Sequence, residues 1–163
     1  MIVMFVNNSV NDGICEWYLC WTMDDPFNLQ RFVDAQEPVY PQVLDELGHG
    51  QKTSHWMWFV FPQIAGLGHS ATAQRYAISS TDEAQAYLDH PVLGPRLVEC
   101  INVLLGVDGR TAEQILGGVD TLKLRSCLTL FFAVSGGENV FEDALDKYFD
   151  GVPDLRTLTT IRC

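Results

Sequence analysis

The chain has 163 residues, a formal charge of −11, 47% hydrophobic residues and 19% charged residues. This balance excludes a disordered chain, and the length suits one domain whose core needs no disulfide or metal for stability. The acidic excess disfavours general nucleic-acid binding and binding to an anionic membrane, because both depend on clustered Lys and Arg.

Targeting signals and metal motifs are missing from the sequence. No apolar run approaches the ~20 residues of a membrane-spanning helix, and the short apolar start has no basic residue before Arg31. We therefore expect no signal peptide and a cytoplasmic location. The five cysteines have no zinc-ligand spacing, so the sequence predicts neither a metal nor a cofactor.

Residues 1–22 differ from the rest in having no regular period. We expect an N-terminal extension there, either an apolar arm or residues upstream of the native start, followed by a single helical domain over 23–163. Asp25 is a favourable N-cap and Pro26 suits the first helical position. The first helix is therefore predicted to run from this pair to about Glu37, where Pro38 ends it.

The next elements are a second helix over 40–47, ended by Gly48, and an apolar stretch over 54–61. Period alone does not separate a buried helix from a buried strand in that stretch. We predict a buried helical turn that Pro62 ends, followed by a glycine-containing loop over 66–68.

Later helices have clearer start and stop signals. Ser80 with Glu83, and Thr111 with Gln114, have the spacing of capping boxes, and Asn139 is a favourable N-cap. Helices are predicted over about 80–90, 93–104, 111–116, 120–132, 139–148 and 154–161. The sum is an all-α fold of seven to nine short helices that is not a simple four-helix bundle.

One segment has an unusual charge pattern. From residue 47 to residue 81 there is no Asp or Glu, although the chain holds 21. Cations, histidines and aromatic rings in this segment suit a small anionic, nucleotide-like ligand such as ADP-ribose or an NAD derivative, because rings stack on a base and cations receive phosphate. The predicted ligand-binding residues are Lys52, Trp56, Trp58, Gln63, Ser70, Arg75, Tyr76, Arg96 and Lys123. Arg125 and Ser126 would extend the positive cluster from another helix.

His55 is the candidate general acid or base, because an imidazole titrates near working pH. A second interpretation competes with the site as a whole: a core segment contains few acids in any protein, and large aromatic rings are buried in any core. For Ser70, which opens a helix, the ordinary N-cap role is favoured over a phosphate contact. No GxxxxGK[ST], GxGxxG, GxSxG or HExxH motif occurs, so the sequence identifies no reaction and leaves open whether the protein is an enzyme.

Several stretches resemble the bacterial family known as domain of unknown function 1810. They are DPFNLQRFVDAQ, GHGQKTSHWMWFVFPQIAGLGHSATAQRYAI, EAQAYLDHPVLGPRL, DTLKLRSCLTLFF and FEDALDKYFDG, which span most of residues 25–158. The resemblance implies a compact, mostly helical fold and implies no activity. Polar positions that match the family pattern are Gln36, Lys52, His55, Gln63, Ser70, Tyr76, His90, Arg96, Lys123 and Ser126.

Two other functions compete with ligand binding. In the first, the protein is a non-catalytic adaptor whose acidic helices over 24–46 and 138–150 face a basic partner protein, which predicts an exposed apolar patch rimmed by acids. The second, a metal-dependent hydrolase, ranks last because the histidines and carboxylates lack ligand spacing. The sequence predicts no oligomeric state.

Overall fold

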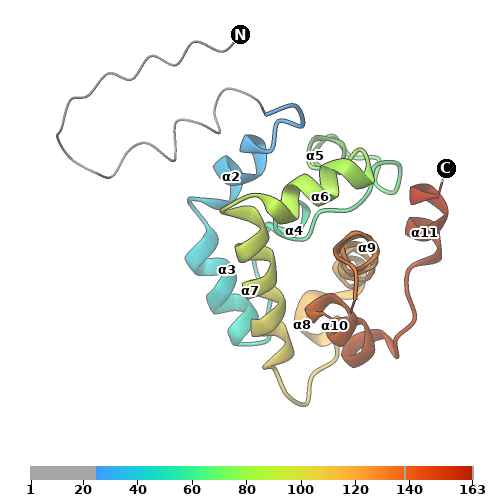
Figure 1. Ribbon diagram of the computed structural model, residues 1–163. Helices are drawn as coiled ribbons and strands as arrows, with labels where there is room; N and C mark the ends of the chain where they lie inside the picture. The colour runs from blue at the N-terminus through green and yellow to red at the C-terminus, as the bar shows by residue number, and fades with distance from the viewer. Residues whose placement is uncertain (1–24, 138, 163) are drawn as a thin grey trace, which may run out of the picture.

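The computed structural model describes residues 25–137 and 139–162 (Figure 1). The expected N-terminal extension over 1–22 lies outside the described residues, so the division into an extension and a single domain stays a prediction. Within the described ranges the chain forms ten helices, one isolated parallel bridge between Ile64 and Ile78, and no extended strand. The predicted all-α fold is confirmed.

The helices are named as in Figure 1, and three of them, α4, α5 and α8, have only four or five residues. Their bounds are α2 Gln30–Gln36, α3 Tyr40–Gly48, α4 Met57–Val60, α5 Ala71–Arg75, α6 Thr81–Asp89, α7 Leu93–Leu105, α8 Ala112–Leu116, α9 Gly118–Ser135, α10 Val140–Phe149 and α11 Leu155–Ile161. In the part of the chain that the structure describes, no helix is long and apolar enough to cross a membrane.

Helix α9 is the central element, and helices α6, α8, α10 and α11 all pack against it (Figure 1). Its buried residues include an unbroken run from Ser126 to Phe131. A helix buried on nearly every face must be apolar on nearly every face, and Leu128, Leu130 and Phe131 are all fully buried. The position of α9 determines which side chains the other helices place beside one another.

Most predicted helix starts are confirmed. Asn139 and Asp154 accept hydrogen bonds from amides in the first turns of α10 and α11, and Thr111 with Gln114 forms a complete capping box at α8. At α6 the capping box is half formed. Ser80 accepts the amide of Glu83, but the Glu83 carboxylate binds Ser79 and Arg31 instead of the Ser80 amide.

Two predicted starts were wrong in position. Helix α2 begins at Gln30 rather than Pro26, because Asn28 has a left-handed backbone with φ of 53° that interrupts the helix. Asp25 still accepts the amides of Leu29 and Gln30, at 2.7 and 3.0 Å. Helix α9 begins at Gly118, so Asp120 lies in its first turn and is free to form ion pairs there.

The buried Glu46 carboxylate fixes the chain that follows α3. It accepts six hydrogen bonds of 2.7–3.2 Å, from Gln42 Nε2, Thr53 N and Oγ1, Ser54 N and Oγ, and Trp56 Nε1. Burial raises the pKa of this carboxyl, but the hydrogen bonds from Thr53, Ser54 and Trp56 outweigh burial and hold the pKa well below its ordinary value of 4.5. A carboxylate with this many donors stays ionised inside the protein.

Glu83 has the matching role at the far end of the acid-free segment. Its carboxylate accepts the amide and hydroxyl of Ser79, at 2.8 and 2.6 Å, and lies 2.6 Å from the Arg31 guanidinium. The segment without acids is therefore held at both ends by carboxylates that lie just outside it in the sequence.

Glu46→Gln tests the first of these contacts. An amide keeps the shape but replaces one accepting oxygen by a donor, so we expect the free energy of unfolding in urea to fall by about 2 kcal/mol at neutral pH. Because the pKa of Glu46 is lowered in the folded state, its contribution is full above pH 4.5 and declines as the pH falls below that value. The difference between wild type and variant should shrink over the same range.

Asp45→Asn is the matched control, since Asp45 is the neighbouring acid on α3 with a side chain that is 71% exposed. It should change the free energy of unfolding by no more than about 0.5 kcal/mol. Equal stabilities for the two variants would contradict the role given to Glu46.

Candidate functional site

A cavity of about 460 Å³ lies where α4, the loop before α5, the start of α9 and the start of α11 meet. Its volume falls in the range of about 300–1,000 Å³ that small-molecule sites occupy. The residues that line it are Trp58, Gln63, Leu67, Gly68, His69, Ser70, Ala73, Val119, Leu122, Lys123, Arg125, Ser126, Asp154 and Arg156.

The lining is rich in positive charge. Lys123, Arg125 and Arg156 contribute three cations, and the only carboxylate in the lining belongs to Asp154. That carboxylate caps α11, because it accepts the amide and hydroxyl of Thr157 and the hydroxyl of Ser126, at 3.0, 2.6 and 3.0 Å. Burial raises the pKa of Asp154, but these hydrogen bonds outweigh burial and lower it overall. Asp154 is thus ionised, and its charge is shared with its own hydrogen-bond donors.

Lys123 and Trp58 are held together on one wall of the cavity. The Lys123 ammonium lies 4.3 Å from the centre of the Trp58 ring and 2.7 Å from Asp120 Oδ1. Asp120 also pairs with Lys52, again at 2.7 Å. Burial raises the pKa of Asp120, but the hydrogen bonds from both lysines outweigh it and lower the pKa overall. Two lysines share one carboxylate, so this wall keeps one positive charge in excess.

The two arginines of the cavity differ in how far they are engaged. Arg125 donates its Nε to the carbonyl of Val152 at 2.8 Å and lies beside the Phe149 ring. Arg156 is exposed, and its guanidinium has no hydrogen bond or ion pair to any residue that the structure describes. The Arg125 guanidinium is therefore held through its Nε, whereas the Arg156 guanidinium makes no polar contact with the described residues.

Four of the nine predicted ligand-binding residues lie on this cavity: Trp58, Gln63, Ser70 and Lys123. The helix-capping role of Ser70 is present as well, since its hydroxyl oxygen accepts the amide of Ala73 at 3.1 Å. Sequence reasoning missed Arg156. Its only sequence signal is a position in the first turn of a helix that Asp154 caps, and nothing local indicates that this helix packs on α9.

Lys52 and Trp56 lie behind the cavity rather than on it. Trp56 is 1% exposed and donates its indole N–H to Glu46 at 2.8 Å. The Lys52 side chain is 8% exposed and lies between Asp120 and the Trp56 ring. In this structure neither side chain presents a surface to a ligand, and both hold the wall that carries Trp58 and Lys123.

The other predicted residues are not brought to the cavity. Tyr76 packs between the rings of Phe32 and Phe59, and Arg75 lies against Tyr76. Arg96 pairs with Glu37 at 2.6 Å and covers the ring of Tyr40. His55 is exposed and lies outside the cavity lining. The acid-free segment therefore does not form one convergent site. Its residues Trp58, Gln63 and Ser70 line the cavity, whereas Arg75 and Tyr76 pack elsewhere.

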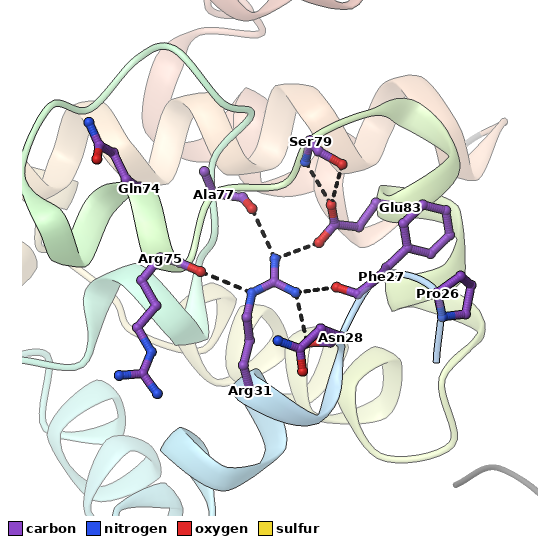
Figure 2. Close-up of a pocket in the computed structure, with 9 residues that line it drawn as sticks. All are labelled: Pro26, Phe27, Asn28, Arg31, Gln74, Arg75, Ala77, Ser79 and Glu83. Atoms are coloured by element: carbon purple, nitrogen blue, oxygen red, sulfur yellow. Dashed lines mark hydrogen bonds and ion pairs between the residues drawn. The ribbon is translucent and has the colours of Figure 1, made fainter. Parts of the chain in front are cut away.

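A second hollow, of about 420 Å³, surrounds Arg31 (Figure 2). All five N–H donors of this guanidinium are engaged: it donates to the carbonyls of Phe27, Asn28, Arg75 and Ala77 and to the carboxylate of Glu83. Figure 2 shows the Arg75 guanidinium pointing away from Arg31. A ligand could recruit Arg31 only by breaking bonds that join α2 to α6, so this hollow is a structural junction.

Arg31→Lys tests that assignment. Lysine keeps the charge but cannot serve five acceptors in a planar fork, so we expect the free energy of unfolding to fall by about 2–4 kcal/mol. Arg75→Lys is the control, because Arg75 is exposed and lines the same hollow; it should change stability by less than about 0.5 kcal/mol. Urea unfolding measures both, and a stable Arg31→Lys protein would refute the structural role.

Comparison with known proteins gives a family without an assigned activity. No curated protein matches the chain. The crystal structure of the conserved hypothetical protein Rv1873 from Mycobacterium tuberculosis, at 1.38 Å, is similar, with 52% sequence identity and a TM-score of 0.84 over 85% of this chain and 99% of that chain. The model of the family described as protein of unknown function (DUF1810) matches residues 26–161. The chain therefore belongs to the DUF1810 family, as its sequence resemblance predicted.

Proposed function

We propose that the cavity between α4, α9 and α11 binds a small anionic ligand that carries a flat ring, with nucleotides such as ADP-ribose as the nearest class. The observation that carries this proposal is local charge. A chain with a net charge of −11 and ten Lys and Arg residues places three of those ten around one cavity. The one carboxylate of the lining is already hydrogen-bonded, to Thr157 in the first turn of α11 and to Ser126 of α9.

The remaining groups of the cavity suit the two parts of such a ligand. Arg125 and Arg156 are suited to phosphate, because a guanidinium donates two parallel hydrogen bonds to its oxygens. Trp58 offers an aromatic surface for a base, and Lys123 already covers part of that ring. Gln63 and the hydroxyl hydrogen of Ser70 supply neutral donors for a ribose or a base edge.

The proposal is for binding, in a cytoplasmic protein, and includes no reaction. The histidine expected to act as an acid or base, His55, lies outside the cavity lining. The adaptor alternative is the weaker proposal. It requires an exposed apolar patch rimmed by acids, whereas Val119 and Leu122, two of the most exposed large hydrophobic side chains described, lie beside cavity cations.

Arg156→Gln gives the most direct test, because its guanidinium has no partner to lose among the described residues. We expect wild type to bind ADP-ribose or ADP in isothermal titration, and the variant to bind about tenfold more weakly, the effect of losing one charge-assisted hydrogen bond.

Arg162→Gln is the control, since Arg162 is an exposed arginine at the other end of α11 and is not part of the cavity lining. Its affinity should equal that of wild type. Folded wild-type protein that gives no heat with any nucleotide, or two variants with equal affinities, would reject the proposed function.

A further inference from the structure

The exposed apolar side chains of this protein gather where α9 and α11 begin. Among the described residues, the exposed large hydrophobic side chains are Leu155 at 73%, Val119 at 72%, Leu122 at 64% and Val152 at 48%. Val119 and Leu122 lie in the first turns of α9, and Val152 and Leu155 lie just before and at the start of α11, which packs on α9. Single exposed hydrophobic side chains are ordinary, but four in one region indicate a binding surface.

The surface beneath these side chains is concave. The cavity of about 460 Å³ is lined by Val119 and Leu122, and a neighbouring hollow of about 370 Å³ is lined by Leu155. The two hollows share Leu67 and Arg156, so they form one depression, and both have polar and apolar residues in their lining. A depression of mixed lining suits a short segment of chain that carries polar and apolar side chains together.

Cations lie among the apolar side chains. Lys123, Arg125 and Arg156 line the cavity together with one carboxylate, that of Asp154. Arg156 follows Leu155 directly in the chain, and its guanidinium has no hydrogen bond or ion pair to any residue that the structure describes. Guanidinium groups pair with carboxylates through two parallel hydrogen bonds. The local charge therefore favours an acidic partner, although the chain as a whole has a net charge of −11.

We propose that this region is the docking surface for an acidic segment of another protein, in which large apolar side chains alternate with Asp or Glu. The apolar side chains of the segment pack on Val119, Leu122 and Leu155, and one of its carboxylates pairs with Arg156. The adaptor considered from the sequence had the opposite charges, with acids on this protein and basic groups on its partner. This inference does not rest on the proposed function, but a nucleotide and the segment would compete for Arg156.

A peptide segment accounts for these side chains better than a small ligand or a membrane does. Leu155 lies outside the cavity lining and Val152 lines neither hollow, so a ligand that fills the cavity leaves both exposed. An anionic membrane repels a chain of net charge −11 over its whole surface. A short segment contacts only the local cations, and recognition of acidic motifs by clustered arginines is a recurring mode of peptide binding.

The test is a selection on the full chain from a displayed library of random peptides of about 16 residues, long enough for four helical turns. A labelled copy of an enriched peptide is then titrated by fluorescence anisotropy. We expect the enriched sequences to be acidic and to contain several large apolar residues. Their affinity should fall as the salt concentration rises, because exposed charge pairs are screened.

Two variants and a matched control locate the surface. Leu122→Ser and Arg156→Gln should each weaken binding of the enriched peptide about tenfold, the effect of losing one central contact. Both side chains are exposed, so both variants should fold, which circular dichroism checks. Arg162→Gln is the control, because Arg162 is an exposed arginine just beyond α11 that lines neither hollow, and it should keep the affinity of wild type.

A selection that enriches no peptide, or only basic ones, would overturn the docking surface, as would enriched peptides that bind both variants as tightly as wild type. Self-association in sedimentation, or binding to phosphatidylserine vesicles, that both variants lose would assign the region to a second copy or to a membrane instead. Nucleotide titration separates the two proposals. If peptides bind and no nucleotide does, the docking surface stands alone, and the reverse result leaves only the proposed function.

Discussion

The carboxylate of Glu46 is the contact on which the rest of this structure depends. It collects donors from the chain between residues 53 and 56, a stretch that has no regular hydrogen-bonding pattern of its own. Buried donors without acceptors are costly, so the indole N–H of Trp56 can be buried only beside such an acceptor. Helix α4 begins directly after this stretch, and its residue Trp58 lines the cavity.

The absence of acids between residues 47 and 81 has a structural explanation in part. The donors of this segment are met by acids that lie elsewhere in the sequence: Glu46 for Trp56, Glu83 for Ser79 and Asp120 for Lys52. The segment supplies core residues such as Trp56 and also residues that line the cavity, such as Trp58 and Gln63, so the two interpretations of its composition are not exclusive.

The same contacts explain why positive charge remains at the cavity. Arg31 is saturated by carbonyls and Glu83, and Arg96 is paired with Glu37. Lys52 and Lys123 together have one carboxylate, and Arg156 has no charged partner that the structure describes. Arg31 and Arg96 are thus neutralised by nearby acceptors, whereas Arg156 at the cavity has no such partner among the described residues.

Helix starts were predictable from sequence where the signal lies within one turn, as at Asn139 and Asp154, because a cap and its amides are three residues apart. The prediction failed at Asp25, because the left-handed conformation of Asn28 has no strong local signature. Of the residues that line the cavity, sequence reasoning selected Trp58 and Lys123 but not Arg156, which reaches the cavity only through the packing of α11 on α9.

The orientations of His55 and Trp56 were beyond sequence reasoning for a related reason. A helical period assigns faces only inside a helix, and both residues precede α4. The direction of Trp56 is set instead by Glu46, ten residues before it. A contact at that separation, outside regular structure, leaves no periodic trace in the sequence.

The central claim is that Trp58 faces the ligand while Trp56 belongs to the interior. It is tested most directly by following the indole N–H resonances of the folded protein during titration with ADP-ribose, with Trp→Phe variants to assign the peaks. We expect the Trp58 resonance to shift in proportion to saturation and the resonance of the Trp56 indole, which donates to Glu46, to stay in place. A shift of Trp56 with Trp58 unmoved would contradict it.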